Sequence, residues 1–450
     1  MAHRDEIKDQ VREATDIAQL IGEDIAIHAK GREFVAVCPF HDDHAPSMTI
    51  SRQKQIYKCF ACGAGGDAFS WMVNYHNLTF PEALKQLADR AGIDLPTRGE
   101  PADGNSPRER ISAVNDLTMN LYRRTLAESP AAEHARQYVE QRGISGEMVE
   151  KFKLGYAGSE WDSLSKHAAK HQWDIAALEM AGLVRQRSSS DGLFDFLHHR
   201  LIFPILDRLG RPIAFAGRKL ESDDDGPKYL NIAETPLFNK SATLYGIHEA
   251  QRPIIEAKTA VIVEGYTDVI ACHQAGVRNV IATMGTSLTA DHAKTLARYA
   301  ERVVLIFDAD EAGQKAADRA LEVFFRGEMD VAIAVLPQGQ DPADLLQQDD
   351  GREAWQRAID EATDALDYQF ARVRSQFDAA PGLTARQRLV EDYLDKLAGL
   401  GFSRLEPVRR GLVVQRLARL IGLESSELNR LLTDKARAAR APKRVPREPA

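Results

Sequence analysis

The clearest pattern of hydrophobic and polar positions lies between residues 258 and 342, where short apolar runs alternate with amphipathic segments. The apolar runs are 260–263, 280–283, 303–307 and 331–335, and the segments between them have helical spacing. Short runs rich in β-branched residues, separated by helical segments, indicate parallel strands joined by crossover helices. We therefore predict a parallel α/β sheet in this region.

The pattern on either side of this region differs from it. Residues 111–255 mix helical stretches with strands, including a hairpin in which residues 200–206 and 212–215 are joined across Asp207 to Arg211. Residues 343–434 are helical throughout, with apolar positions spaced three and four apart. The predicted fold is therefore multidomain: an α+β subdomain, a parallel α/β sheet and a C-terminal helical bundle.

Two segments lack any apolar periodicity. Residues 97–110 are rich in Pro, Gly, Asn, Ser and charge, which predicts a linker after a first domain of residues 1–96. Residues 435–450 hold six Lys or Arg, one Glu and three Pro, which predicts a disordered basic tail.

Composition narrows the class of protein. The chain has 450 residues, of which 44% are hydrophobic and 28% are charged, so it can form about three globular domains. No apolar run is long enough to span a membrane, and four cysteines are too few for a disulfide scaffold. We expect a cytoplasmic protein. Its formal net charge of -8 argues weakly against a polyanionic partner, but the basic residues are clustered.

Three of the cysteines lie close to a histidine in the first domain. Cys38-Pro-Phe-His41 and Cys59-Phe-Ala-Cys62 form two pairs of soft ligands, expected on separate strands of an N-terminal zinc ribbon whose finger spans residues 38–62. Three thiolates and an imidazole suit one structural zinc ion with no open position. The alternative is buried free thiols beside a surface histidine, and the pair-plus-pair spacing favours zinc.

Cations and rings surround these ligands. Arg52, Lys54 and Lys58 alternate with Phe40, Tyr57 and Phe60, a composition that suits a single nucleic-acid strand. The alternative, equally supported by these residues, is solubilising cations around a small aromatic core. Cys272 lies in a helical stretch and is expected to be a small buried residue without chemistry.

Carboxylates follow the ends of the predicted parallel strands. Where strands are parallel, their carboxyl ends meet at one edge, so these side chains are expected to converge. Oxygen ligands select Mg²⁺ or Mn²⁺, and about two such ions would support phosphoryl transfer. Taken singly, each acid could instead cap a helix. The residues are Glu264, Asp268, Asp308, Asp310, Asp341 and Asp344.

Together these motifs resemble the bacterial DNA primases over nearly the whole chain. The resemblance is carried by Cys-Pro-Phe-His, Cys-Phe-Ala-Cys-Gly, Val-Glu-Gly-Tyr-Thr-Asp-Val-Ile, Phe-Asp-Ala-Asp and Asp-Pro-Ala-Asp-Leu, in that order. Residues 258–342 are similar to the toprim domain, which implies that Glu264, Asp308 and Asp310 bind catalytic magnesium. Asp268 is expected to act with them, and Asp341 and Asp344 to lie just outside the metal ligands. Ala309 departs from the glycine more common in the family.

The resemblance also assigns a basic motif. Residues 198–219 contain five Lys or Arg and one Asp, and Pro227-Lys-Tyr-Leu-Asn231 follows. By resemblance Arg142, Arg218 and Lys228 hold nucleotide or template phosphates, and Arg200 and Lys58 are expected to join them. Without the family match, a solvated hairpin face would explain these residues.

The function implied is a DNA primase, a nucleotidyltransferase that makes short RNA primers from ribonucleoside triphosphates on single-stranded DNA. A non-catalytic DNA-binding mediator is the main alternative, because zinc modules also accompany toprim folds in recombination proteins. A fused helicase would need a Gly-Lys-Ser/Thr loop, and the sequence has no Gly-Lys pair. A topoisomerase would need an attacking tyrosine, which cannot be selected among eleven.

Relatives continue into a C-terminal helicase-binding domain that has no counterpart in these residues. Either the chain is truncated or this member does without that module. The replicative helicase is therefore the weakest of the expected partners.

Overall fold

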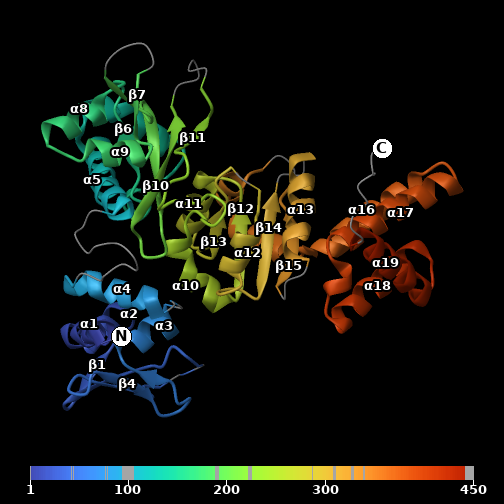
Figure 1. Ribbon diagram of the computed structural model, residues 1–450, viewed down its shortest axis with the longest axis horizontal. Coiled ribbons are helices and arrows are strands. Elements are labelled where there is room, and N and C mark those ends of the chain that lie inside the picture. Colours follow the sequence, from blue (N-terminus) through green and yellow to red (C-terminus); the bar gives the residue numbers. More distant parts are fainter. Residues whose placement is uncertain are drawn as a thin grey trace, which may run out of the picture.

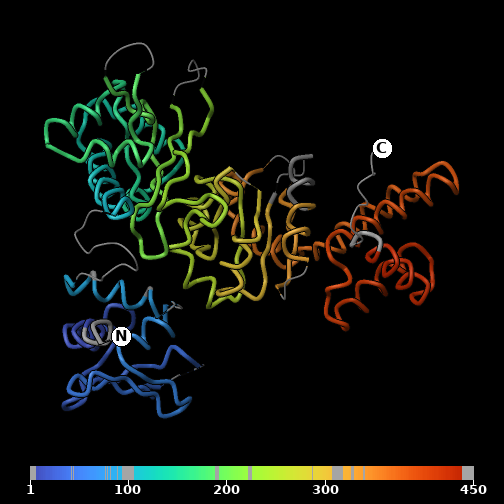
Figure 2. Tube along the Cα trace, in the orientation of Figure 1, coloured from blue at the N-terminus to red at the C-terminus, as the bar shows by residue number. Residues whose placement is uncertain are grey.

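The computed structural model describes residues 2–41, 43, 45–76, 78, 80–93, 106–187, 192–220, 226–285, 287–307, 311–325, 329–337 and 340–440. Figure 1 shows that these residues form four parts in chain order: a small N-terminal module, a mixed subdomain, a sheet covered by helices, and a helical bundle. The colours of Figure 2 follow the same order from the N-terminal module to the bundle.

The N-terminal module packs four helices against an antiparallel sheet of order β1-β2-β3-β4-β5. Its core centres on Trp71 and Tyr57, which are fully buried, and Asp16 and Asp67 cap α2 and α3 by accepting backbone N–H groups. The elements are α1 (Ala2–Ala14), α2 (Ile17–Asp24), β1 (His28–Lys30), β2 (Glu33–Ala36), β3 (Met48–Ser51), β4 (Ile56–Cys59), β5 (Gly65–Gly66), α3 (Ala68–Tyr75) and α4 (Phe80–Ala91).

The linker predicted at 97–110 is wrong at its C-terminal end. Helix α5 (Pro107–Glu128) begins inside it, with Ser106 and Glu109 forming a capping box and proline at the first helical position. The Ser-Pro-Arg-Glu sequence carries this signal, but the polar composition around it obscures the helix start. Residues 97–105 lie outside the described part of the chain.

The mixed subdomain is built on a four-stranded sheet of order β11-β10-β9-β6, flanked by helices. The predicted hairpin is confirmed: β9 and β10 pair antiparallel and are joined across Asp207 to Arg211. The further elements are η1 (Pro130–Ala132), α6 (Glu133–Gln141), α7 (Gly146–Lys151), β6 (Gly155–Ala157), α8 (Ser163–Lys170), α9 (Ile175–Met180), β7 (Val184–Gln186), β8 (Leu193–Asp195), β9 (Arg200–Leu206), β10 (Pro212–Lys219) and β11 (Tyr229–Asn231).

Pro204 lies in the middle of β9, where a missing N–H would normally cost a ladder hydrogen bond. Strand β6 pairs only with Arg200 to Ile202 on one side of β9, while Pro204 lies opposite Phe215 on the other side. Because β9 pairs with no second strand beyond Ile202 in the described part of the subdomain, proline is tolerated in this buried strand.

The predicted parallel sheet is confirmed. Strands β13, β12, β14 and β15 pair in parallel, and the short β16 adds an antiparallel edge that the sequence prediction missed. The elements are α10 (Ile247–Ala257), β12 (Thr259–Val263), α11 (Tyr266–Gln274), β13 (Val280–Ala282), α12 (Ala290–Leu296), β14 (Arg302–Phe307), α13 (Glu311–Phe324), β15 (Asp330–Val335), α14 (Pro342–Leu346), α15 (Gly351–Asp360) and β16 (Thr363–Asp364).

Successive residues of these strands enter two different cores. Val261, Val263, Val304 and Ile306 pack with the mixed subdomain, whereas the alternating residues, such as Ile262 and Leu305, pack with the bundle. Side chains alternate between the faces of a sheet, so a strand buried on both faces is apolar throughout. This explains the uninterrupted apolar runs in the sequence.

The C-terminal bundle consists of α16 (Ala365–Ala379), α17 (Leu383–Gly399), η2 (Phe402–Arg404), α18 (Pro407–Ile421) and α19 (Ser425–Arg440). The tail predicted as disordered from 435 is wrong for its first residues, because α19 continues to Arg440. The apolar positions Leu428, Leu432 and Ala436 are buried at four-residue spacing and carry the helix through Lys435. Residues 441–450 are outside the described chain.

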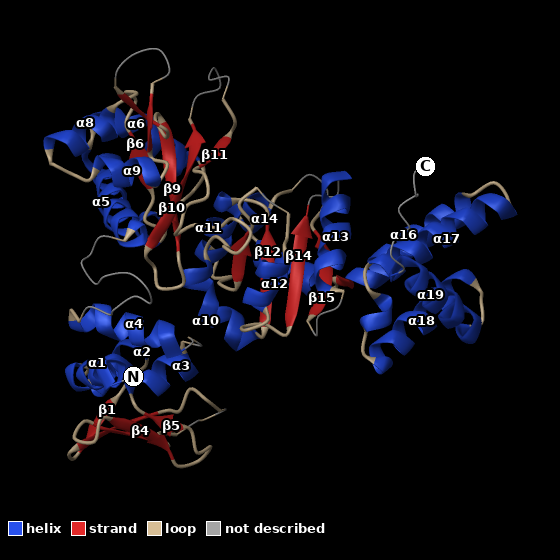
Figure 3. Cartoon of the chain, in the orientation of Figure 1, coloured by secondary structure: helices blue, strands red, loops and turns tan. Residues whose placement is uncertain are grey.

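The N-terminal module contacts the core at α10, as Figure 3 shows. The guanidinium of Arg252 lies 4.3 Å from the ring centroid of Tyr75, and Gln251 donates a hydrogen bond to the carbonyl of His76. Among the described helices, none combines the length and the apolar character needed to cross a lipid bilayer.

Candidate zinc centre and carboxylate edge

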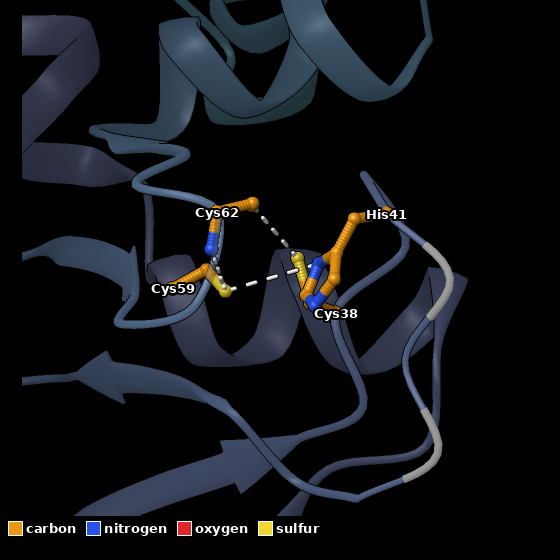
Figure 4. Close-up of side chains that lie close together, drawn as sticks. All are labelled: Cys38, His41, Cys59 and Cys62. Atoms are coloured by element: carbon orange, nitrogen blue, oxygen red, sulfur yellow. Dashed lines mark hydrogen bonds between the residues drawn. The ribbon is translucent and has the colours of Figure 1, made fainter.

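Two loops of the N-terminal module bring four soft ligands together. Cys38 and His41 lie on the loop after β2, whereas Cys59 ends β4 and Cys62 lies in the following turn, so only Cys59 occupies a strand. One ligand atom from each residue lies within 4.8 Å of the others. Figure 4 shows the two pairs facing each other across a small gap. The sequence prediction of one four-ligand cluster is met by this geometry.

The thiols differ in their electrostatic environment. Burial raises the pKa of Cys38 to about 12. Burial acts in the same direction on Cys59, but hydrogen bonds from Ser47 and two backbone N–H groups outweigh it and lower the pKa of that thiol to about 6. Thiols this close cannot all ionise without a compensating cation. Three sulfurs and an imidazole fit a closed tetrahedral zinc site.

Asp43 and Ser47 connect the two loops behind the ligands. The carboxylate of Asp43 accepts the N–H of Cys38 at 2.7 Å and the hydroxyl of Ser47 at 2.6 Å. Ser47 Oγ in turn lies 3.3 Å from Cys59 Sγ. These hydrogen bonds, led by that of Ser47, lower the pKa of Asp43 to about 2. Neither residue was predicted from the sequence, although an Asp two positions after a ligand histidine is a usable signal.

Some of the rings around the zinc centre are buried, whereas Phe60 and Lys58 are exposed. Tyr57 is 1% exposed and packs with Phe40 and Trp71, so the alternative of a small aromatic core holds for these rings. Phe60 is 77% exposed. Lys58 donates from Nζ to the carbonyl of Gly63 at 2.8 Å, and it remains exposed.

Within the described chain, the predicted acidic edge is represented by Glu264, Asp268, Asp341 and Asp344, which follow the carboxyl ends of the parallel strands. Ile262 of β12 pairs with Leu305 of β14, and extending this register places Glu264 beside Phe307. Phe307 directly precedes Asp308 in the chain. Asp308 and Asp310 themselves lie outside the described residues, so their side chains are not placed.

Asp268 and Asp341 both cap helices at this edge. Asp268 accepts the N–H of Gly265 at 3.0 Å at the start of α11, and Asp341 accepts the N–H of Asp344 at 2.7 Å at the start of α14. Asp344 is exposed. The carboxylates of Asp268 and Asp341 therefore cap helices, and their roles beside the metal ligands stay predictions. The only cluster of three or more metal-ligating side chains found among the described residues is the cysteine and histidine set.

The predicted cations separate into two groups. Arg142 and Arg218 lie over the same ring, that of Tyr138, and Lys228 precedes Tyr229, which is paired with Arg218 across β10 and β11. Arg200 is 5% exposed, and its guanidinium donates to the carbonyls of Gly217 and Pro227. The prediction that Arg200 contacts nucleic acid is not supported, because its hydrogen bonds hold the hairpin to the Lys228 segment.

Cys272 is completely buried in α11, as expected for a residue without chemistry. Burial raises its pKa well above the ordinary value, which keeps the thiol protonated and unreactive.

Comparison with known families matches three consecutive segments. A CHC2 zinc finger model matches residues 3–102, the N-terminal domain of the DNA primase catalytic core matches residues 121–251, and a Toprim-like model matches residues 261–346.

Curated relatives match along most of the chain. DNA primases of Pseudomonas aeruginosa and Halalkalibacterium halodurans are 36% and 38% identical over 94% and 75% of this chain, which spans 64% and 56% of their lengths. DNA primase of Synechocystis is 33% identical over 96% of this chain and 70% of the relative. The chain thus spans less than two thirds of the first two relatives.

Solved structures agree with the fold. The Aquifex aeolicus primase, containing zinc-binding and RNA polymerase domains, is 29% identical with a TM-score of 0.61, and the match covers 94% of this chain and 98% of that one. A DNA primase domain from Pseudomonas aeruginosa is 34% identical with a TM-score of 0.65 over 72% of this chain and 99% of its own. A primase catalytic domain bound to single-stranded DNA is 31% identical with a TM-score of 0.62, over 71% of this chain and 99% of that one.

Proposed function

This chain belongs to the bacterial DNA primase family, and from that premise we propose that it is a DNA-templated RNA polymerase that makes short primers on single-stranded DNA. Its substrates would be ribonucleoside triphosphates. The observation that carries the proposal is the register of β12 and β14, which brings Glu264 beside the strand that leads into Asp308.

Glu264, Asp308 and Asp310 would hold about two Mg²⁺ or Mn²⁺ ions, since the donor set is all oxygen. When bound, such ions lower the pKa of an attacking hydroxyl and offset charge on the phosphates. Asp268 would act with them from the start of α11, where its carboxylate also caps the helix. Asp341 caps α14 on the neighbouring segment.

Arg142, Arg218 and Lys228 would bind the phosphates of the incoming nucleotide or of the template. Guanidinium groups form charge-assisted hydrogen bonds with phosphate, and these position the strand without reading its sequence. Cys38, His41, Cys59 and Cys62 would hold one zinc ion that stabilises the N-terminal module. Lys58 and the exposed ring of Phe60 next to that site would contact single-stranded template.

A primer-synthesis assay tests the proposal. The zinc-loaded protein should incorporate labelled ribonucleotides on a single-stranded template in the presence of Mg²⁺, and Asp308→Ala should reduce the product by at least about a hundredfold, the scale of losing one metal ligand at a phosphoryl-transfer site. Asp349→Ala is the control, since Asp349 is an exposed aspartate in the turn after α14 and should retain activity within about threefold. Normal product from Asp308→Ala would rule out the proposed chemistry, and DNA binding without RNA synthesis by the wild type would favour a mediator.

A further inference from the structure

Two arginines lie over the ring of one tyrosine in the mixed subdomain. Tyr138 lies near the end of α6, and the guanidinium carbon of Arg218 is 4.2 Å from the centroid of its ring. The corresponding distance for Arg142 is 5.6 Å. Arg218 also lies 5.7 Å from the ring of Tyr229, so it is held between two aromatic side chains that belong to different elements.

Within the ranges that the structure describes, neither Arg142 nor Arg218 forms an ion pair with a carboxylate. A tyrosine ring attracts cations through its quadrupole, but it cannot neutralise two of them. Two guanidinium groups around one ring therefore favour an anion between or beside them, and phosphate fits the planar donors of arginine.

One member of this group, Arg142, lies beside the two helices that begin at the acidic edge. Arg142 and Thr267 line a cavity of about 270 Å³ between the α6–α7 loop, α11 and α14. Thr267 is in the first turn of α11, three residues after Glu264, and it shares a side-chain hydrogen bond with Tyr229. A phosphate held by the arginines would thus lie on the side of α11 that leads to the catalytic edge.

We propose that Tyr138 is a positioning residue that holds Arg142 and Arg218 as one clamp for phosphate groups. The inference deepens the proposed function and rests on it for the identity of the ligand, which is a nucleoside triphosphate or the template backbone. Tyr138 was not a candidate at the level of sequence. A tyrosine at helical spacing predicts a core position, and the ring does pack against the core, but it also lies under two cations.

Binding without catalysis tests the clamp. In the absence of divalent metal no primer forms, and the affinity of the zinc-loaded chain can be measured separately for ATP and for a fluorescein-labelled single-stranded oligonucleotide of about 16 nucleotides. Tyr138→Leu should weaken binding by about tenfold in at least one arm, the size expected for losing desolvated cation–π contacts. Tyr138→Phe should bind within about twofold of wild type, because the ring remains.

A matched control removes another cation–π contact of the same subdomain. Arg185 lies 3.8 Å from the ring centroid of Phe196, and Phe196→Leu removes that contact without touching the clamp. This variant should bind both probes as the wild type does. A loss confined to ATP assigns the clamp to the triphosphate, and a loss confined to the oligonucleotide assigns it to the template.

A double-mutant cycle keeps the test decisive if Tyr138→Leu lowers stability. When Tyr138 acts through Arg218, the losses of Tyr138→Leu and Arg218→Gln are not additive, whereas a general structural defect adds to the loss of charge. Additive losses, or a Tyr138→Leu protein that binds both probes as tightly as wild type, would overturn the proposal. If the wild type binds phosphate probes through the clamp but makes no primer, the proposed function fails and the clamp stands.

Discussion

At the scale of single residues, the zinc centre depends on groups that do not touch the metal. Asp43 accepts the backbone N–H of Cys38, and Ser47 links Asp43 to the sulfur of Cys59. Outer hydrogen bonds of this kind orient the ligands and typically change metal affinity by about 10- to 100-fold. The two loops are therefore coupled through one carboxylate.

We predict that Asp43→Ala releases zinc at least about tenfold faster than wild type. The reason is that Cys38 loses the hydrogen bond that fixes its backbone, and Ser47 loses its partner. Release into a chromogenic chelator measures the rate directly. Ser47→Ala should show a smaller acceleration, because the Asp43 to Cys38 bond remains, and Asp9→Ala, an exposed aspartate of the same module, should match wild type. Equal rates for Asp43→Ala and Asp9→Ala would contradict this role.

The zinc ligands were the part of the site that could best be predicted from the sequence, because they are recognised by residue type and short spacing. The four zinc ligands are separated by two residues within each pair, so local chain geometry alone brings each pair together. The role of Arg200 could not be predicted in this way. Its side chain is buried by Gly217 and Pro227, which approach it only after the hairpin has formed.

At the scale of elements, α10 and α11 each bury a histidine beside the ring of Phe152. The side chain of His248 is 7% exposed, and its charged neighbours are Glu249, Lys151, Lys153 and Asp207. Burial lowers the pKa of His248 from 6.5 to about 4, and burial has the same effect on His273. These helices therefore pack best while both imidazoles are neutral.

Stability should fall as the pH is lowered from about 6.5 towards 4. In that window the unfolded chain binds a proton at His248 while the folded chain does not, so protonation favours unfolding. For His248 alone the loss is roughly 2 kcal/mol at pH 5 relative to pH 7. Urea unfolding of the core at the two pH values measures it.

The variant His248→Leu should lose about that share of the pH dependence, because leucine is buried without a proton to bind. Substitution of the exposed His28 by Gln should leave the dependence as it is in wild type. An unchanged difference between pH 7 and pH 5 in His248→Leu would show that this imidazole does not titrate as its burial requires.

Elements with strong periodicity were predictable, and elements marked by a few local residues were not. The parallel strands and the β9–β10 hairpin follow from apolar runs and turn residues. The start of α5 depends on Ser106 and Glu109 within a polar stretch, and β16 is only two residues long. Such short signals are outweighed by the composition around them.

At the scale of the whole molecule, the central sheet joins two cores that the sequence does not distinguish. Along β12 and along β14, alternate side chains pack into different hydrophobic cores. The sheet therefore couples the mixed subdomain to the bundle. The strand order β13-β12-β14-β15 depends on packing between remote segments and could not be read from local pattern. That order is what places Glu264 beside the strand leading to Asp308.

The most direct test is whether the strand ends at Glu264 and Asp308 form a divalent-metal site. Binding of Mn²⁺ by the zinc-loaded chain, followed by the electron paramagnetic resonance signal of the free ion, measures this. We predict that Mn²⁺ binds in competition with Mg²⁺, and that Glu264→Gln weakens binding at least about tenfold by removing one carboxylate ligand. Glu301→Gln, an exposed carboxylate at the opposite end of β14, should bind as wild type. Binding by Glu264→Gln equal to that of wild type would contradict the account.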